Sequence, residues 1–277
     1  MNKNVRIGGV LASILVIGLI FALVGCSGES SGENGGSSET GEYKPTPERF
    51  FTTRMDISGD VRQGKTETFE LTDFEETDEI WEKYKGLVVV PTKIDGRKID
   101  KYNVSIFSNS KFLDKLVIPD ASLVEGWLFN EHVTSVIVKG TPKKTMNFHG
   151  CDKLQTLTID EVGKDGVMPR ISGTSIESFV VPKDCKYIPT SHLKGTKSTS
   201  SKLKCLKCPK GVIFVADIHH NDSFGFTPSD ATTDWGNIIA TDLESLTKMF
   251  EGRKPYDTWD DDLPFLPDIV EFYDVEP

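Results

Sequence analysis

Residues 107–118 read FSNSKFLDKLVI, and residues 148–159 read FHGCDKLQTLTI. The two stretches place apolar or small residues at identical spacing, beginning with Phe107 in the first and Phe148 in the second. Their common ending, apolar-x-x-apolar-x-apolar, starts at Leu113, Val133, Leu154, Ile176 and Leu203, at intervals of 20, 21, 22 and 27 residues. One such unit cannot bury its own apolar side chains. We therefore predict that the units stack as coils of a solenoid, each contributing one strand.

The repeat interval is the one expected of leucine-rich repeats. The stretches YKGLVVVPTKIDGRKID (84–100), IFSNSKFLDKLVIPDAS (106–122) and NFHGCDKLQTLTID (147–160) resemble the BspA-like leucine-rich repeat proteins of bacterial surfaces. The resemblance covers roughly Tyr84 to Val215 and implies adhesion to host or neighbouring-cell components. Lys139 and Asp160 stand where that family places proline, and Phe129 precedes Val133 by a shortened turn. These departures predict less regular coils.

The alternation of a strand sorts the repeat into inward and outward columns. Cys208 aligns with Ile118, Val138, Ile159 and Val181 in an inward column, whereas Cys205 falls in an outward one. The two thiols of LKCLKCP (203–209) should then point apart. We therefore predict no metal or redox site at this C-x-x-C, and we treat Cys208 as a small core residue.

The outward columns form the first candidate binding site, a broad and shallow platform suited to a protein or glycan surface. Its residues alternate polar with β-branched side chains along the strands. They are Lys115, Val117, Ser135, Ile137, Thr156, Thr158, Ser178 and Val180. The alternative is that β-branched residues stand there only because they suit strands.

A basic patch is the second candidate site. The whole chain has a formal charge of −10, which argues against nucleic acid as a partner, yet no acidic residue occurs from Cys185 to Ala216. The patch comprises Lys194, Lys197, Lys202, Lys204, Lys207 and Lys210. It would suit an anionic cell-wall polymer, or it would be a solvated edge in contact with the acidic tail of the protein itself.

Residues 1–25 carry two positive charges, Lys3 and Arg6, ahead of an apolar run, as in a secretory signal peptide. An uncleaved membrane anchor is the alternative, because the run is long enough to span a bilayer. The tetrapeptide from Leu23 to Cys26 resembles the bacterial lipobox, which implies a mature chain that starts at lipidated Cys26. Residues 26–45 then form a disordered Gly/Ser/Glu tether. We expect an extracytoplasmic protein, lipid-anchored to the bacterial membrane and exposed at the cell surface or in the periplasm.

The flanks are expected to cover the ends of the solenoid. Residues 46–86 contain the alternating run KTETFELT and a helical pattern with Ile80, Trp81 and Tyr84 on one side. Residues 87–216 are the solenoid, and residues 217–277 form a C-terminal cap and acidic tail, with a capping box from Thr241 to Glu244. The predicted fold is strand-rich α+β: a short solenoid of parallel strands between an N-terminal strand/helix cap and a C-terminal helix-containing cap.

No Gly-x-Ser-x-Gly elbow and no phosphate-binding Gly-rich loop occurs in the sequence. We predict a lipoprotein that binds a macromolecular partner, protein or glycan, without catalysis, cofactor or metal, and that has no catalytic residues. An envelope accessory lipoprotein that engages wall polymer through the lysines is the first alternative. An extracytoplasmic hydrolase with carboxylates in the irregular acidic tail is the weaker one.

Overall fold

The structure is a computed structural model that describes residues 43–58, 66–194, 201–217, 238–249 and 266–275. All of them belong to one compact unit, Ser38–Pro277. The predicted signal peptide, Cys26, the tether up to residue 42, Lys197 and much of the acidic tail lie outside the described residues. Among the helices that are described, none is both long and apolar enough to cross a bilayer.

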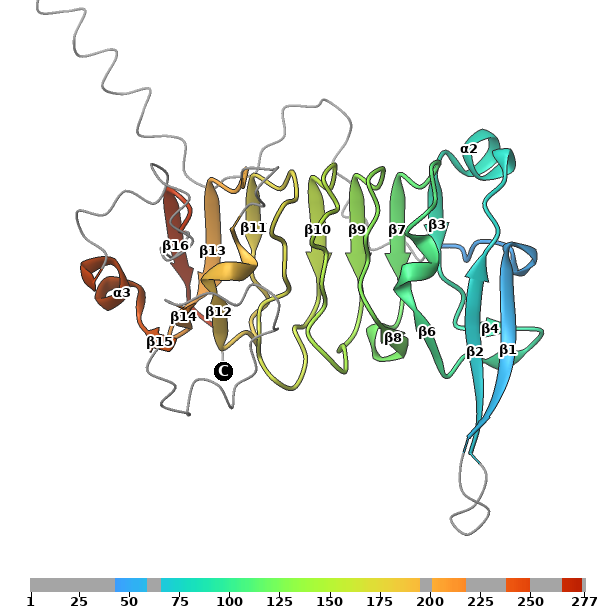
Figure 1. Cartoon of the computed structure of the whole chain (residues 1–277), viewed down its shortest axis with the longest axis horizontal. Coiled ribbons are helices and arrows are strands. Elements are labelled where there is room, and N and C mark those ends of the chain that lie inside the picture. Colours follow the sequence, from blue (N-terminus) through green and yellow to red (C-terminus); the bar gives the residue numbers. More distant parts are fainter. Residues whose placement is uncertain (1–42, 59–65, 195–200, 218–237, 250–265, 276–277) are drawn as a thin grey trace, which may run out of the picture. The chain divides into compact units, whose positions relative to one another are not determined.

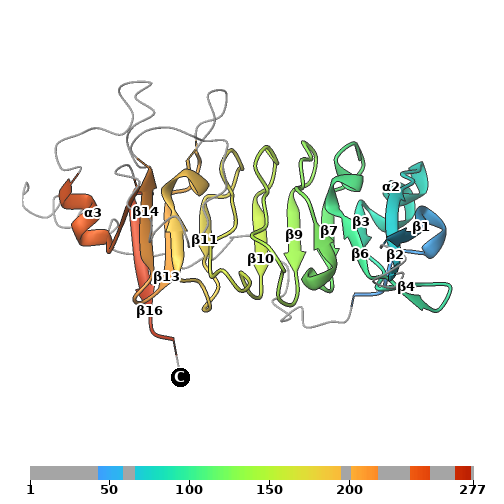
Figure 2. The same ribbon diagram turned by 60° about the horizontal axis from the view of Figure 1, so that its bottom comes forward.

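The repeat strands pair in parallel, as predicted. The first sheet has the order β10-β9-β7-β3, formed by β3 (Leu87–Val89), β7 (Lys115–Ile118), β9 (Ser135–Val138) and β10 (Thr156–Ile159). Lys115 pairs with Ser135, and Ser135 with Thr156, so the predicted register is confirmed. A further parallel sheet contains β11 (Ser178–Val180), β13 (Cys205–Pro209) and β16 (Ile269–Tyr273). Both views show these strands side by side in the order of the repeat (Figures 1 and 2).

The repeat strands therefore fall into two sheets instead of one continuous row. β11 is bonded toward β13, as in the hydrogen bond from Val181 N to Lys207 O, and does not share a sheet with β10. The coils of β10 and β11 are still linked at the turn before the strands, where Ser175 N donates to Leu154 O at 2.9 Å.

The other strands form separate sheets. One mixed sheet has the order β1-β2-β6-β8, made by β1 (Phe51–Ser58), β2 (Thr66–Phe74), β6 (Lys101–Asn103) and β8 (Val124–Glu125). Another has the order β12-β14-β15, made by β12 (Tyr187–Pro189), β14 (Ile213–Asp217) and β15 (Ile238–Thr241). A hairpin pairs β4 (Lys93–Ile94) with β5 (Arg97–Lys98). Short 3-10 turns complete the coils at Glu48–Phe50, Val104–Phe107, Ala121–Leu123 and Thr190–His192.

The inward columns share one interior. Leu116 and Val136 are fully buried, and so are Phe107 and Phe148, the first residues of the two matched stretches. All four belong to a single cluster of buried apolar side chains that runs from Phe50 to Leu246. Burial of large aliphatic and aromatic side chains contributes roughly 1.5–3 kcal/mol each. The shared core is therefore what holds successive coils together.

Asn130 occupies the turn position that Ser110 and Cys151 take in the neighbouring coils. Its side chain is fully buried, and Nδ2 donates to the carbonyl oxygens of Phe107 and Ser110 at 2.7 and 2.9 Å. Oδ1 accepts from the backbone N–H groups of His132 and Val133, each at 2.8 Å. One amide thus bonds backbone groups of two consecutive turns.

The prediction that Phe129 takes the aromatic core position of the coil before Val133 was wrong. Leu128 takes that position with 1% exposure, and Phe129 is 52% exposed. Because neighbouring residues of an extended segment point to opposite sides, a shift of one residue moves the ring from the core to the surface. The sequence pattern missed this shift because the turn between the core position and Val133 is shorter than in the neighbouring coils.

Two α-helices lie in the described parts of the flanks. Helix α2 (Asp78–Tyr84) buries Ile80 fully but leaves Trp81 52% exposed, so the prediction that both face the same side was wrong. Consecutive residues of a helix are about 100° apart around its axis, which separates the two side chains. The hydrogen bond from Gly86 N to Ile80 O closes the helix, and Gly86 has a φ of +75° that favours glycine.

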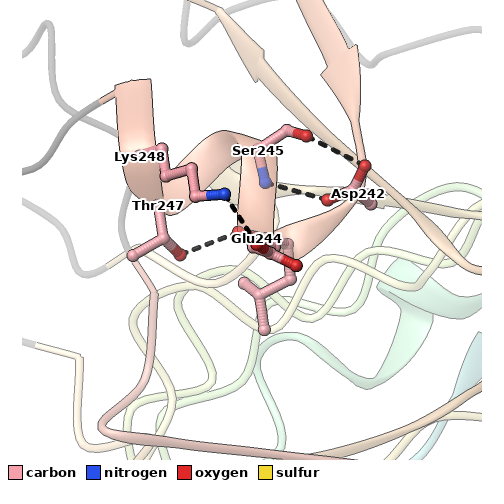
Figure 3. A network of polar contacts seen from close by, with 6 residues as sticks. Asp242, Glu244, Ser245, Thr247 and Lys248 are labelled. Carbon is pink, nitrogen blue, oxygen red and sulfur yellow. Dashed lines mark hydrogen bonds and ion pairs between the residues drawn. The ribbon is translucent and has the colours of Figure 1, made fainter.

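Helix α3 (Leu243–Met249) occurs where the capping box predicted it, but Asp242 caps it instead of Thr241. Asp242 Oδ1 accepts from Ser245 N at 2.8 Å, and Ser245 Oγ lies 3.0 Å from Asp242 Oδ2 (Figure 3). These bonds to Ser245 hold the pKa of the Asp242 carboxyl below its ordinary value. Glu244 pairs with Lys248 at 2.6 Å, four residues on, and does not serve as the second half of a capping box.

Candidate binding face on the parallel strands

The outward side chains of the first sheet form two columns, as the alternation predicts. One runs through Lys115, Ser135 and Thr156, and the other through Val117, Ile137 and Thr158. Ser178 pairs with Cys205 and Val180 with Lys207, which continues the same two positions in the next sheet. The residues predicted for the binding face thus come from consecutive strands whose relative positions are fixed by backbone hydrogen bonds.

The first part of this face is covered by the chain itself. Val89 and Val117 are 2% and 1% exposed, although neither belongs to the core cluster. We attribute this burial to the segment from Tyr43 to Thr46, which contacts Val89 and Lys115 before β1 begins. Thr46 N donates to Val89 O at 3.0 Å, and Val89 N donates to Thr46 Oγ1 at 2.8 Å. Val117 was therefore wrongly predicted as an exposed binding residue, because a distant segment removes it from solvent.

Tyr43 anchors the start of the covering segment. Its hydroxyl accepts from Lys115 Nζ at 3.1 Å. The ring also lies under two ammonium groups, 5.0 Å from Lys115 Nζ and 5.7 Å from Lys139 Nζ. Such cation–π contacts hold an aromatic ring without a pocket. Lys115, another predicted binding residue, is consequently half-buried and engaged within the protein.

The uncovered part of the face begins at β9 and widens toward β11. Ser135 and Ile137 are half-buried, whereas Thr156, Thr158 and Ser178 are exposed. Val180 is 61% exposed, an unusual value for a large aliphatic side chain in the middle of a strand. We call Thr156, Thr158, Ser178 and Val180 the open face. Its side chains are uncharged, and the adjacent charged pair, Lys204 Nζ and Glu177 Oε2, is closed at 3.0 Å.

The structure places the two C-x-x-C cysteines in different surroundings. Among the described residues no group of three or more His, Cys, Asp or Glu side chains is placed to hold a metal ion. Cys208 is fully buried in the core cluster, as predicted, and burial raises the pKa of its thiol to about 12. Cys205 occupies an outward column and is absent from the core cluster, yet it is only 6% exposed. Cys205 therefore lies in an outward column, as predicted, but it is not accessible to solvent.

Three lysines of the patch form ion pairs within the described residues. Lys207 Nζ lies 3.9 Å from Glu271 on β16, and Lys210 Nζ lies 2.7 Å from Asp274. Lys204 pairs with Glu177, as described above, and Lys202 Nζ donates to Ser175 Oγ at 3.0 Å. Lys194 is half-buried, and Lys197 is outside the described residues. The acidic C-terminal strand thus compensates part of the patch, which was one of the two readings that the sequence left open.

Two exposed aromatic residues, Trp127 and Phe129, were not predicted as candidates for a site. No local signal identifies them. Asn130 keeps the same distance to Val133 as Cys151 keeps to Leu154, but the spacing of Phe148 and Cys151 would then put Trp127 in the core, whereas Leu128 is the buried residue.

Comparisons with known proteins give little. No family model and no curated protein matches the chain. The solved structure of a leucine-rich repeat protein of T. pallidum is similar over 59% of this chain and 71% of that chain, with 18% sequence identity and a TM-score of 0.35.

Proposed function

We propose that the chain is a leucine-rich repeat lipoprotein of a bacterial surface that binds a protein partner through the open face, without catalysis. The repeat interval, the parallel register of β7, β9 and β10 and the shared core support a solenoid. The strands and helix before β3 would then cover one end, and β15 with α3 the other. The BspA-like motifs around Phe107 and Phe148 support the link to surface adhesion.

Anchoring through Cys26 rests on the sequence before the described residues. The apolar run, the lipobox-like tetrapeptide ending at Cys26 and the Gly/Ser/Glu stretch after it support a lipid anchor with a spacer. Metabolic labelling with a radioactive fatty acid tests this part. The wild-type chain should incorporate label and stay with membranes, whereas Cys26→Ser should do neither; equal labelling of both would contradict the anchor.

The exposure of Val180 is the observation that carries the binding proposal. A β-branched residue on a rigid strand loses little conformational freedom on binding and offers apolar area to a flat partner. Around it, the hydroxyl groups of Thr158 and Ser178 can donate and accept hydrogen bonds. An uncharged and shallow surface of this kind suits a protein surface, and its binding should depend only weakly on salt.

Capture experiments with a paired control test the open face. Intact protein is immobilised and exposed to surface proteins of neighbouring bacteria and to host-matrix proteins, together with Val180→Arg and Val275→Arg variants. Val275 is also an exposed valine, 42% accessible, but it lies after β16 and outside the open face. We expect a partner that intact protein and Val275→Arg retain and that Val180→Arg binds at least about tenfold more weakly.

Ionic strength separates this function from binding of an anionic wall polymer. A contact led by the open face should survive in about 0.5 M salt, whereas one led by the lysine patch should be lost. Retention of the partner by Val180→Arg at the wild-type level, or loss of binding in high salt alone, would count against the open face.

A further inference from the structure

A row of alternating residues after β8 exposes two aromatic side chains. Trp127 is 70% exposed and Phe129 is 52% exposed, with Leu128 buried between them. Glu125 and Glu131, which stand on either side of the two rings in the sequence, are also exposed. Residues two apart in an extended segment point to the same side and lie about 6–7 Å apart. The two rings therefore share one surface, distinct from the open face.

The next two coils place planar polar groups beside these rings. Leu128 N donates to Asn147 O at 3.1 Å, and Phe148 N donates to Arg170 O at 2.8 Å. The three segments thus run side by side. As Leu128, Phe148 and Ile171 are buried in the core, the residues next to each one point the other way, and all of these except Ser172 are at least partly exposed. We call the resulting surface the aromatic belt, formed by Trp127, Phe129, Asn147, His149 and Arg170.

A single buried hydroxyl holds two members of the belt. Ser172 is 1% exposed, and its Oγ accepts from Arg170 Nε at 2.9 Å. The same Oγ lies 2.8 Å from His149 Nδ1. The guanidinium and the imidazole are therefore oriented by the protein before any ligand arrives, and less side-chain entropy is lost when they bind one.

Gly150 holds the ring of Phe129. A Cβ at position 150 would lie 2.2 Å from one ring carbon of Phe129 and 2.5 Å from another, so the ring rests directly on the glycine backbone. The φ of Gly150 is +82°, which also favours glycine. The exposed ring is thus seated in a defined place, not left free in solvent.

The geometry points to a carbohydrate-binding site: the aromatic belt takes a neutral hexose oligosaccharide. Aromatic faces stack on the apolar C–H faces of successive sugar rings, and the spacing of Trp127 and Phe129 suits neighbouring units of a chain. The amide of Asn147 beside them can hydrogen-bond a ring hydroxyl group, and the imidazole and guanidinium add planar polar groups to the same surface. The carboxylates of Glu125 and Glu131 can accept from further hydroxyl groups.

The negative charge near the rings favours a neutral ligand over an anionic one. Glu125 and Glu131 are exposed on either side of the rings in the sequence and repel phosphate, sulfate and uronate groups. They equally oppose docking on an anionic lipid surface, which attracts lysines and arginines. The formal charge of −10 for the chain also disfavours anionic ligands and anionic membranes.

Calorimetry with defined sugars tests the proposal. The intact chain, kept in a detergent without a sugar headgroup, is titrated with maltohexaose, cellohexaose, chitohexaose and a sulfated hexasaccharide. We expect one neutral hexasaccharide to bind and the sulfated one not to bind. Trp127→Ala should weaken binding at least about tenfold, and Arg170→Lys, which keeps the charge but loses the planar group, about fivefold.

Trp81→Ala is the matched control, because Trp81 is 52% exposed but lies on helix α2. It should bind the sugar as the wild type does, and so should Val180→Arg, which alters only the open face. Urea unfolding of each variant confirms that the fold is retained. The proposal is overturned if none of the neutral sugars binds at about 10 mM, or if Trp127→Ala and Trp81→Ala bind equally. Trp127-dependent binding to lipid vesicles instead of sugar overturns it as well.

Discussion

Thr46 and Val89 exchange two hydrogen bonds: Thr46 N donates to Val89 O at 3.0 Å, and Val89 N donates to Thr46 Oγ1 at 2.8 Å. The two residues are 43 positions apart, and Thr46 is only 3% exposed. This pair fixes the covering segment on the strands and thereby decides which part of the sheet remains open to a partner.

Thr46→Val removes the hydroxyl at nearly constant shape. The N–H of Val89 would lose its partner in a buried place, so we expect the free energy of unfolding to fall by about 1–3 kcal/mol in urea titrations. Thr156→Val is the control, because Thr156 is an exposed threonine on β10 and should change stability by less than about 0.5 kcal/mol. Equal effects of the two substitutions would show that the covering segment is not held by this bond.

Asn130→Ala removes an amide that makes four hydrogen bonds to the backbone. Several backbone groups in two turns would be left unsatisfied, and we expect a loss of about 3 kcal/mol or more in the free energy of unfolding. Asn109→Ala, at an exposed position in the preceding turn, should be close to neutral. A loss below about 1 kcal/mol for Asn130→Ala would mean that water replaces the amide without cost.

His192 makes stability depend on pH. The ring is 4% exposed and its Nδ1 lies 2.8 Å from Met168 O, so it carries its proton on Nδ1 and is neutral. Burial lowers its pKa from 6.5 to about 4, and nearby Arg170 adds to the effect. Below about pH 6.5 the unfolded chain binds a proton that the folded chain does not. This contribution to stability is therefore complete above that pH and is lost as the pH falls toward 4, by about 3 kcal/mol.

Urea unfolding at pH 7.5 and 4.5 measures this effect by comparing wild type with His192→Gln. We expect the variant to lose less stability between the two pH values, whereas His132→Gln, at an exposed site, should keep the wild-type difference. An unchanged pH dependence in His192→Gln would show that other groups account for it.

The buried thiols should be unreactive in the folded protein. Burial raises the pKa of Cys151, Cys185 and Cys208 to about 12 each, so almost no thiolate exists at pH 8. We expect iodoacetamide to modify these cysteines only after unfolding in urea, as read by mass spectrometry of the peptides. Rapid labelling of Cys208 in the native state would be inconsistent with a packed core position. Protection of Cys208 from the label by added zinc, seen only in the unfolded chain, would reveal a metal-binding preference.

Much of the fold could be predicted because burial repeats with the sequence. Leu116, Val136 and Ile118 are fully buried where the pattern placed them, and the pairing of Lys115 with Ser135 follows the predicted register. A register shift by one residue would have exposed every one of these side chains, so the apolar pattern specifies it strongly. The candidate site was less predictable: Val117 fits the outward pattern as well as Val180 does, yet their exposures are 1% and 61%.

The sequence by itself determined which side chains face inward and in what order the strands follow, because the period of the apolar residues is a local property of the chain. Only the tertiary structure decided what remains accessible. The cover on Val117 comes from a segment more than sixty residues earlier, and the partners of Lys207 and Lys210 come from residues more than sixty positions later. Exposure and charge depend on contacts between distant segments, and no local pattern encodes those contacts.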